Sequence, residues 1–209
     1  MSRSRPAEPS WRRSLVRALA LTALCTVDLA ATAASASAAP ADPIAGLLAQ
    51  FASHPHEHAH FTEQTYSRVL THPVDTSGEL YFDAPDRLEK QTLTPVPEDL
   101  LVEGNNVTVT RGTHRRSFQI GEIPLLRPLL EGLRATLAGD LAGLTAHFTL
   151  SFEPTATGWL LTLQPLPGDP QPLFQRLQIG GRDGHVQSLQ IERAGGDRSL
   201  MKITPAEPP

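Results

Sequence analysis

The strongest constraint on this fold is a leucine-rich stretch between Ile123 and Leu144. Six leucines recur there every three or four residues, which places on one stripe of an α-helix Leu126, Leu130, Leu133, Leu137, Leu141 and Leu144. Leu125 and Leu129 widen this stripe, so the helix should lie on a broad apolar surface. Pro128 suits a first helical turn, and Gly139-Asp140 predicts a stop followed by a second, short helix. The stretch is either an ordinary core helix or a hinged apolar lid over a sheet.

The first 38 residues have the features of a secretory signal. Arg12 and Arg13 precede a Leu/Ala-rich run, and small residues suitable for cleavage follow around Ala36 and Ala38. Arg17 and Asp28 make this run a poor membrane anchor, although a retained signal anchor is the alternative. We expect a cleaved secretory signal at residues 1–38, one folded domain at residues 39–205 and a frayed tail at residues 206–209.

Charge and cysteine content exclude several functions. Removing residues 1–38 takes away five arginines and two acidic residues, which leaves 13 basic and 20 acidic side chains and a net charge of −7. Without a Lys/Arg run, nucleic acid is not expected as a partner. The chain's one cysteine, Cys25, lies within the signal, so disulfides, thiol catalysis and cysteine-bound metals are not expected in the mature protein.

The rest of the chain predicts eleven strands separated by Gly, Pro and Asn turns. Six precede the leucine-rich stretch, at residues 61–70, 79–83, 87–94, 100–103, 106–110 and 114–120. Five follow it, at residues 146–153, 158–166, 173–180, 185–193 and 198–204, and a Pro/Gly loop at residues 165–172 lies among them. Each strand has one apolar face, which indicates a curved sheet wrapped around helices. The predicted fold is α+β, mainly β: an unclosed antiparallel half-barrel of about eleven strands with a helical lid or plug.

Two features precede the first strand. Asp42 and Pro43 predict the cap and first turn of a short apolar helix between Pro40 and Ser53. Four histidines then alternate along the chain, at positions 54, 56, 58 and 60. On an extended chain they would share one face and could bind a divalent metal, but an exposed loop is favoured because ligands of other types are missing nearby. No metal and no cofactor is therefore expected.

A half-barrel filled incompletely by helices can hold an apolar ligand. The apolar strand faces and the leucine stripe supply the candidate lipid-binding residues: Leu80, Phe82, Val107, Val109, Phe118, Leu126, Leu130, Leu133, Leu137, Phe148, Leu150, Trp159, Leu161, Leu163, Ile179, Leu189 and Ile191. The alternative is a fully packed barrel, which a contiguous cavity of roughly 300 Å³ or more would argue against.

Several short motifs, in order across Phe61 to Ile203, resemble the LolA-like periplasmic carriers of outer-membrane lipoproteins, in particular their shorter branch. They are Phe61-Thr-Glu-Gln64, Ser77-Gly-Glu-Leu-Tyr-Phe82 with Pro85-Asp-Arg-Leu88, Arg111-Gly112, the stretch Leu125 to Leu144, Gly184-His-Val-Gln-Ser-Leu-Gln-Ile191, and Gly196-Asp-Arg-Ser199. The best-known carriers have Arg immediately before the Pro of the second motif, where it helps to control the lid. Ala84 occupies that position here, and Arg87 follows Pro85 by two residues.

The resemblance implies a monomeric, non-enzymatic carrier that shields the acyl chains of a lipoprotein or other lipidated cargo. Its partners would be an inner-membrane donor complex and an outer-membrane acceptor. The shorter branch also resembles proteins encoded beside lipid acyltransferases and exporters of acylated pigments. The alternative function is therefore a non-transport periplasmic binding or assembly module that works with a lipid or acylated-pigment export system.

Catalytic alternatives are weaker. His185, Asp197 and Ser199 could be arranged as a triad, but the chain has no G-x-S-x-G turn. Carboxylates at positions 86, 89, 98 and 99 could pair for glycoside chemistry, although charges near strand ends usually face water. The sequence therefore favours a binding protein over an enzyme.

Overall fold

The computed structural model describes residues 42–122, 126–167 and 174–206. Outside these residues lie the expected signal, Leu125, most of the loop expected at residues 165–172, and the end of the expected tail. The described residues form one antiparallel sheet and three α-helices. No helix within them has both the length and the apolar character needed to cross a membrane.

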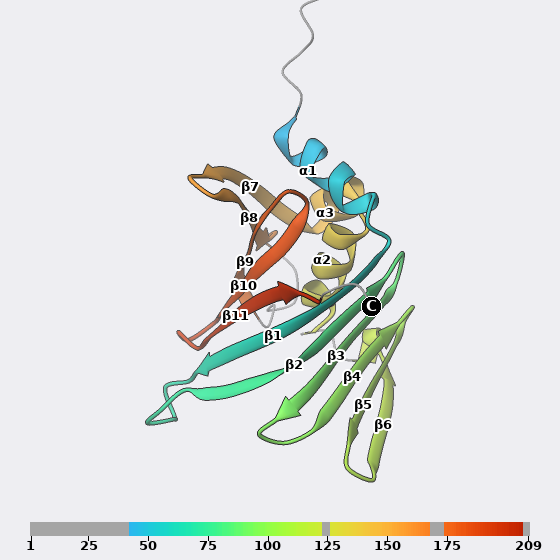
Figure 1. Cartoon of the computed structure of the whole chain (residues 1–209), viewed down its shortest axis with the longest axis vertical. Coiled ribbons are helices and arrows are strands. Elements are labelled where there is room, and N and C mark those ends of the chain that lie inside the picture. Colours follow the sequence, from blue (N-terminus) through green and yellow to red (C-terminus); the bar gives the residue numbers. More distant parts are fainter. Residues whose placement is uncertain (1–41, 123–125, 168–173, 207–209) are drawn as a thin grey trace, which may run out of the picture. The chain divides into compact units, whose positions relative to one another are not determined.

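All eleven strands belong to a single sheet (Figure 1). Their bounds are β1 (His56–Tyr66), β2 (Val74–Asp83), β3 (Arg87–Thr94), β4 (Glu98–Glu103), β5 (Asn106–Arg111), β6 (His114–Gln119), β7 (Phe148–Thr155), β8 (Gly158–Pro165), β9 (Phe174–Arg182), β10 (His185–Arg193) and β11 (Arg198–Pro205). The spatial order is β6-β5-β4-β3-β2-β1-β11-β10-β9-β8-β7. Two meanders therefore join where β1 pairs with β11, and β6 and β7 form the open edges. This confirms the predicted unclosed antiparallel sheet.

Three helices accompany the sheet: α1 (Pro43–Ala52), α2 (Arg127–Leu137) and α3 (Leu141–His147), with a 3₁₀ turn, η1 (Ile120–Glu122), before α2. The side chain of Asp42 accepts a 2.9 Å hydrogen bond from the backbone N–H of Ile44 and caps α1. Asp140 caps α3 in the same way by accepting from Gly143 at 2.9 Å. Gly139, at φ 73°, forms the turn between α2 and α3. These caps confirm the helix boundaries expected from the sequence.

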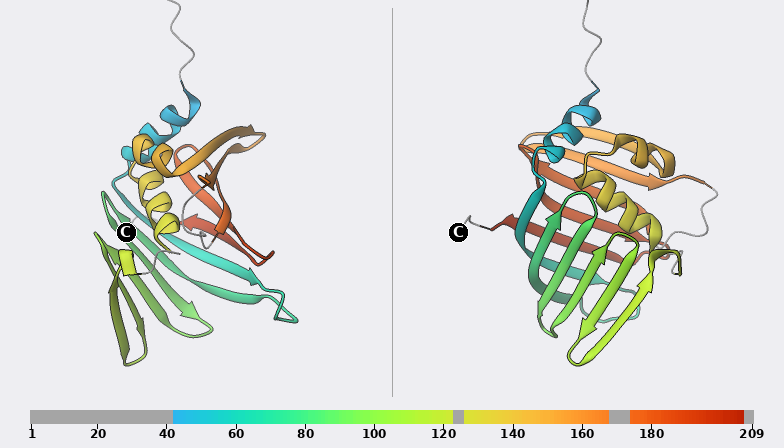
Figure 2. Two further views of the ribbon diagram at one scale, coloured as in Figure 1. Left: turned by 180° about the vertical axis from the view of Figure 1, so that it is seen from behind. Right: turned by 90° about the vertical axis from the view of Figure 1, so that its right-hand side faces the viewer.

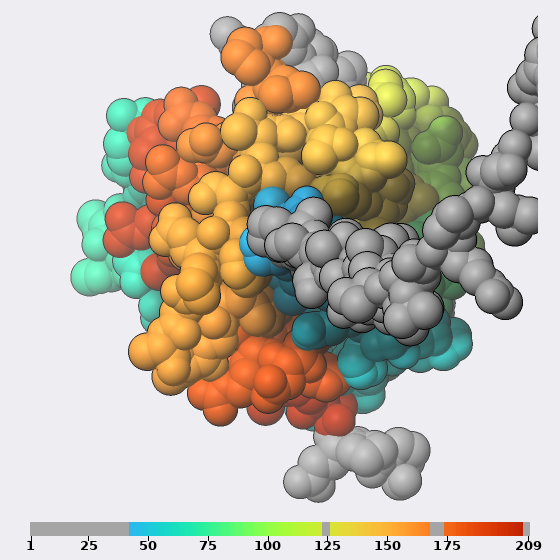
Figure 3. Space-filling model, turned by 90° about the horizontal axis from the view of Figure 1, so that it is seen from above, coloured from blue at the N-terminus to red at the C-terminus, as the bar shows by residue number. Residues whose placement is uncertain are grey.

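Helices α2 and α3 lie inside the curve of the sheet, between its two meanders, and α1 lies at one end (Figure 2). From above, the yellow residues of α2 and α3 lie between the green strands of one meander and the orange strands of the other (Figure 3). In this position α2 has an apolar strand face on each side, one from each meander. A long leucine stripe suits such a site because both sides of the helix are covered.

Two buried clusters result. The main core packs α1 and α3 against β7, β8 and β9, and its fully buried members include Leu48, Leu144, Phe174 and Leu177. The small core packs α2 and η1 against β4 and β5, and consists of Val102, Val107, Ile120 and Leu130. The leucine stripe therefore spans two clusters instead of entering one.

The histidine segment differs from the favoured loop interpretation. His56, His58 and His60 lie within β1, where each is exposed on the same face. Hydrogen bonding to β2 and β11 explains the difference, because β1 pairs with β2 from His56 onward. The loop interpretation was wrong for these residues, since pairing partners far along the chain extend the strand.

Candidate ligand cavity

A cavity of about 330 Å³ lies between α2 and the inner face of the sheet. This volume is in the range of small-molecule sites. Eight of the candidate lipid-binding residues line it: Leu80, Phe82, Leu130, Leu133, Leu137, Ile179, Leu189 and Ile191. The volume argues against a completely packed interior.

The other nine candidates pack in the two cores. Val107 belongs to the small core, and Val109, Phe118 and Leu126 pack against it. Phe148, Trp159, Leu161 and Leu163 belong to the main core, with Leu150 packed against it. In the main core, α1 and α3 fill the space over β7 and β8. Periodicity identified the inward face of each strand, but which inward residues would be covered by a helix depends on the tertiary arrangement.

The cavity is also lined by residues that the sequence pattern did not identify. The apolar ones are Phe51, Ala59, Leu88, Leu100, Leu129, Val186, Met201, Ile203 and Pro205. The polar or charged ones include His54, Glu57, Glu63, Lys90, His185 and Arg193. On β1 the inward face has charged residues, Glu57 and Glu63, on either side of Ala59 and Phe61, so hydrophobicity alone does not identify this face. Strand register identifies the inward face instead, because Ala59 lies opposite Leu80 and Pro205, and Glu63 lies opposite Met201.

An ion pair lies at one end of the cavity. Lys90 on β3 and Ser199 on β11 both donate to the carboxylate of Glu63 on β1. The Lys90 amino group also lies 4.8 Å from the centroid of the Phe61 ring. Burial alone would raise the pKa of Glu63, but Lys90, the Ser199 hydroxyl and the charge of Arg193 together lower it. Glu63 is therefore held as a carboxylate.

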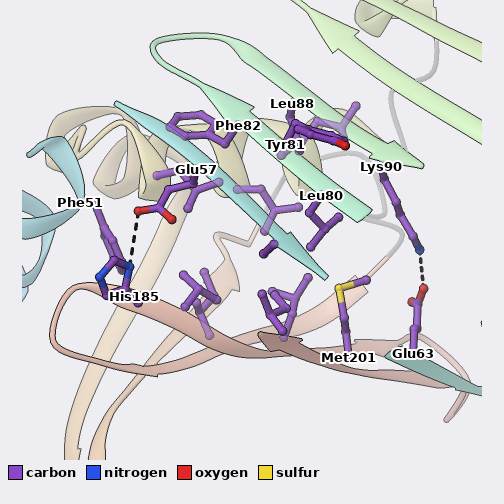
Figure 4. A pocket seen from close by; sticks show the side chains of 18 of the residues that line it. Phe51, Glu57, Glu63, Leu80, Tyr81, Phe82, Leu88, Lys90, His185 and Met201 are labelled. Atoms are coloured by element: carbon purple, nitrogen blue, oxygen red, sulfur yellow. Dashed lines mark hydrogen bonds and ion pairs between the residues drawn. The ribbon is translucent and has the colours of Figure 1, made fainter. Parts of the chain in front are cut away.

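A second polar pair lies at the opposite end. His185 Nδ1 is 3.4 Å from Glu57 Oε1, and the His185 and His54 rings are 4.8 Å apart between centroids. Figure 4 shows the two pairs on opposite sides of the cavity, with Leu80 between them and Met201 beside Glu63. The cavity is thus apolar along its length and polar at both ends.

The proposed triad is not assembled. Ser199 pairs in register with Ile191, six residues along β10 from His185, a separation of about 20 Å. Asp197 instead accepts 3.0 Å hydrogen bonds from the Ser67 hydroxyl and the Arg68 backbone N–H, and these contacts lower its pKa. The three residues therefore cannot act together as nucleophile, base and orienting acid.

The four carboxylates considered for glycoside chemistry do not line the cavity. Glu98 pairs with Arg111 and Asp86 lies 3.9 Å from Arg134, whereas Glu89 and Asp99 lie on the sheet's outer face. Burial and the neighbouring Glu89 carboxylate raise the pKa of Asp99. Glu89 itself accepts a 2.6 Å hydrogen bond from Arg87, which also donates to Asp83 at 2.9 Å. By strand alternation these groups face away from Leu88 and Lys90, which line the cavity. They therefore stabilise the outer face and do not enter the cavity.

The outer-face histidines contact carboxylates singly. His56 Nδ1 is 2.9 Å from Asp83, His58 Nε2 is 3.2 Å from Glu79, and the His58 ring stacks on Tyr81 at 4.4 Å. Hydrogen bonds from Tyr81 and His58 lower the pKa of Glu79. Across residues 42–122, 126–167 and 174–206, no three His, Cys, Asp or Glu side chains form a group that could hold a metal ion.

An arginine connects α2 to the sheet. Arg134 Nη1 donates a 2.8 Å hydrogen bond to the carbonyl of Gly104, and its Nη2 is 3.9 Å from Asp86. Asp86 directly follows Pro85, near the position where the best-known carriers have their strand arginine. Ala84 occupies that position and is exposed, with its backbone N–H bonded to the Pro55 carbonyl at 2.8 Å. The arginine that reaches between helix and sheet therefore comes from the helix.

The fold and cavity define a class of protein: an open antiparallel half-barrel whose concave face and covering helices enclose an apolar space. A family model described as outer membrane lipoprotein carrier protein LolA-like matches residues 33–204. The chain belongs to this family, which confirms the resemblance drawn from the motifs.

The chain is also similar to several individual proteins. An outer-membrane lipoprotein carrier protein from Methylibium petroleiphilum is 29% identical over 183 residues, covering 87% of this chain and 86% of that protein. A LolA superfamily protein from Nitrosomonas europaea is 11% identical with a TM-score of 0.42, covering 78% of this chain and 94% of the other. The lipoprotein LppX from Mycobacterium tuberculosis is 13% identical with a TM-score of 0.40, covering 80% and 98%. The family assignment rests on the sequence match.

Proposed function

We propose that this protein is a periplasmic carrier that shields acyl chains of a lipoprotein, or of a related lipidated cargo, during transfer to the outer membrane. The observation that carries the proposal is the cavity of about 330 Å³, whose middle is lined by apolar side chains from α2 and from both meanders. Family membership supports the cargo class, since the curated relative is named as a lipoprotein carrier.

The same proposal assigns the parts of the chain. Residues 1–38 are a signal peptide that is removed, residues 39–205 are the carrier domain, and residues 206–209 are its tail. An inner-membrane donor complex would load the protein and an outer-membrane acceptor would unload it. The separation of His185 from Ser199 supports a binding role without catalysis.

The lipid-binding surface in this proposal is the set of cavity-lining residues on α2 and the facing strands. Leu133 on α2 is the best position for a test because it lines the cavity and is only partly buried. A buried charge without a partner is strongly disfavoured, so glutamate at this position should exclude an acyl chain.

The experiment compares Leu133→Glu with Ala142→Glu, which places the same charge at an exposed position on α3. Binding of the neutral probe Nile red and native mass spectrometry of detergent-free protein are the readouts. Wild type and Ala142→Glu should bind the probe and retain a lipid or acylated peptide, while Leu133→Glu should fold and bind neither. A wild-type protein that is consistently empty and fails to bind Nile red contradicts the proposal and favours the binding or assembly module.

A further inference from the structure

The end of the cavity formed by Glu63, Lys90 and Arg193 has more positive than negative charge. Lys90 and Arg193 are the two Lys or Arg side chains among the described lining residues, and Glu63 is the carboxylate beside them. The nearby Asp197 does not line the cavity; it accepts from the Ser67 hydroxyl and the Arg68 backbone N–H, and its charge interacts with both Arg68 and Arg193. The side chains that line this end of the cavity therefore include two cations and one carboxylate.

Arg193 also has unused hydrogen-bonding capacity. Its Nε atom is buried and has no hydrogen-bond partner among the described residues. A buried guanidinium donor without an acceptor costs free energy, and an anionic oxygen would satisfy it. Glu63 accepts from Lys90 and Ser199 but makes no hydrogen bond to Arg193 Nε, although the charge of Arg193 helps to lower the pKa of Glu63.

The opposite end has the reverse character. Glu57 supplies a carboxylate there, and none of the described lining residues at that end is Lys or Arg. Glu57 and Glu63 are six residues apart on β1, which corresponds to about 20 Å. One leaflet of a bilayer's hydrocarbon core is about 15 Å thick, so a single acyl chain fits between the two ends.

We propose that Arg193 and Lys90 form a subsite for an anionic headgroup, a carboxylate or a phosphate, whose acyl chain extends along Leu80, Met201 and Leu189 toward Glu57. The proposal rests on the proposed carrier function and names the chemical class and orientation of its cargo. Glu63 neutralises Lys90 in the empty protein and competes with the anionic headgroup of the ligand for Lys90.

Displacement of Nile red by three amphiphiles with the same chain tests the subsite: dodecyl phosphate, dodecanoate and dodecanol, each below its aggregation concentration. Wild type should bind the better of the two anions about tenfold more tightly than dodecanol, because charge-assisted hydrogen bonds are the stronger class. The ranking of phosphate against carboxylate identifies the headgroup.

Substitutions should change this preference in opposite directions. Arg193→Gln should remove most of the preference for the anions over dodecanol, and Arg193→Lys, which keeps the charge, should retain part of that preference. Arg176→Gln is the matched control, because Arg176 pairs with Glu192 at 3.4 Å and does not line the cavity. Glu63→Gln should tighten anion binding severalfold, since it removes the competing carboxylate, an effect that a merely structural role for Glu63 does not predict.

The outcomes separate the two proposals. Equal affinity for dodecanol and both anions in wild type, or an unchanged or weaker anion affinity in Glu63→Gln, overturns the headgroup subsite and leaves the carrier function standing. Failure of all three amphiphiles to displace or replace Nile red contradicts the carrier function itself. If Arg193→Gln does not fold, Arg193→Lys and Glu63→Gln still decide the question.

Discussion

Arg134 on α2 reaches the turn between β4 and β5, where its Nη1 donates a 2.8 Å hydrogen bond to the carbonyl oxygen of Gly104. The side chain is mostly buried, with 21% of its surface exposed. This bond connects the helix that covers the cavity to the meander beneath it. A covering helix can exchange cargo only if such contacts break at a moderate free-energy cost.

We predict that Arg134→Met loosens α2. Methionine keeps the apolar stem but removes the charged donor, which should lower the free energy of unfolding by about 1.5–3 kcal/mol and speed Nile red association. Urea unfolding and stopped-flow fluorescence measure the two effects. Arg127→Met, on the same helix and losing an exposed pair with Glu131, should cost less than about 0.5 kcal/mol. Equal effects of both variants would contradict a tether at Arg134.

A second prediction concerns acid stability. The pKa of Glu63 is lowered below 4.5 in the folded protein, so the unfolded chain binds this proton more readily than the folded one. The stabilisation is present above pH 4.5 and is lost as the pH falls through the lowered value. Glu63→Gln should therefore lose less unfolding free energy than wild type between about pH 6 and pH 3. Glu153→Gln, at an exposed position on β7, should show the same dependence of unfolding free energy on pH as wild type. If the pH dependence of Glu63→Gln also matches that of wild type, the assignment to Glu63 is refuted.

A third prediction uses two helical glycines as a matched pair. A Cβ at Gly46 in α1 would meet nothing within 4 Å, whereas one at Gly132 in α2 would lie 3.0 Å from the Phe148 ring. Gly46→Ala should raise the free energy of unfolding by about 1 kcal/mol through helix propensity. Gly132→Ala should gain nothing or lose stability, because the close contact cancels the propensity gain. An equal gain in both variants, measured by urea unfolding, would show that α2 can move away from β7.

Gly132 also shows what the sequence could and could not reveal. The leucine stretch allowed two interpretations, a core helix or a hinged lid. In the structure Gly132 allows close packing on Phe148, and Gly139 forms a turn at φ 73°. Packing and turn geometry therefore explain these two glycines. Whether α2 moves as a lid is tested by the Arg134→Met experiment. Helix caps and strand turns are local features, so the sequence predicted them well.

The cavity was less predictable because it depends on contacts between distant segments. Trp159 and Leu80 have similar alternating contexts, yet Trp159 is covered by Phe51 of α1 at 5.5 Å between ring centroids, while Leu80 faces the cavity. Glu63 and Lys90 lie 27 residues apart, and only the pairing of β1, β2 and β3 brings them together. No local pattern distinguishes such a pair from solvent-exposed charges.

A fourth prediction concerns the histidines of β1. His56 and His58 each contact a different carboxylate, Asp83 and Glu79 respectively. One imidazole and one carboxylate bind a divalent ion only weakly. Zinc or nickel at micromolar concentration should therefore leave the melting temperature unchanged, in wild type and in a His56→Ala/His58→Ala double variant alike. A rise in wild type that the double variant lacks would establish a metal site on this face.

The last prediction separates empty space from packed core by inserting the same side chain into each. Ala59 on β1 lines the cavity, whereas Val107 on β5 is completely buried in the small core. Phenylalanine at position 59 can enter the cavity, so Ala59→Phe should change the free energy of unfolding by less than about 1 kcal/mol while weakening Nile red binding at least severalfold.

Val107→Phe has no such space. Overpacking the small core should cost about 1–3 kcal/mol, but the folded fraction should bind Nile red with nearly wild-type affinity because Val107 does not line the cavity. Urea unfolding gives the free energy of unfolding of each variant, and probe titration gives its affinity for Nile red. If Ala59→Phe destabilises the protein as much as Val107→Phe and leaves probe binding intact, then the space beside β1 is not where the apolar ligand lies, and the binding surface must be sought elsewhere on the sheet.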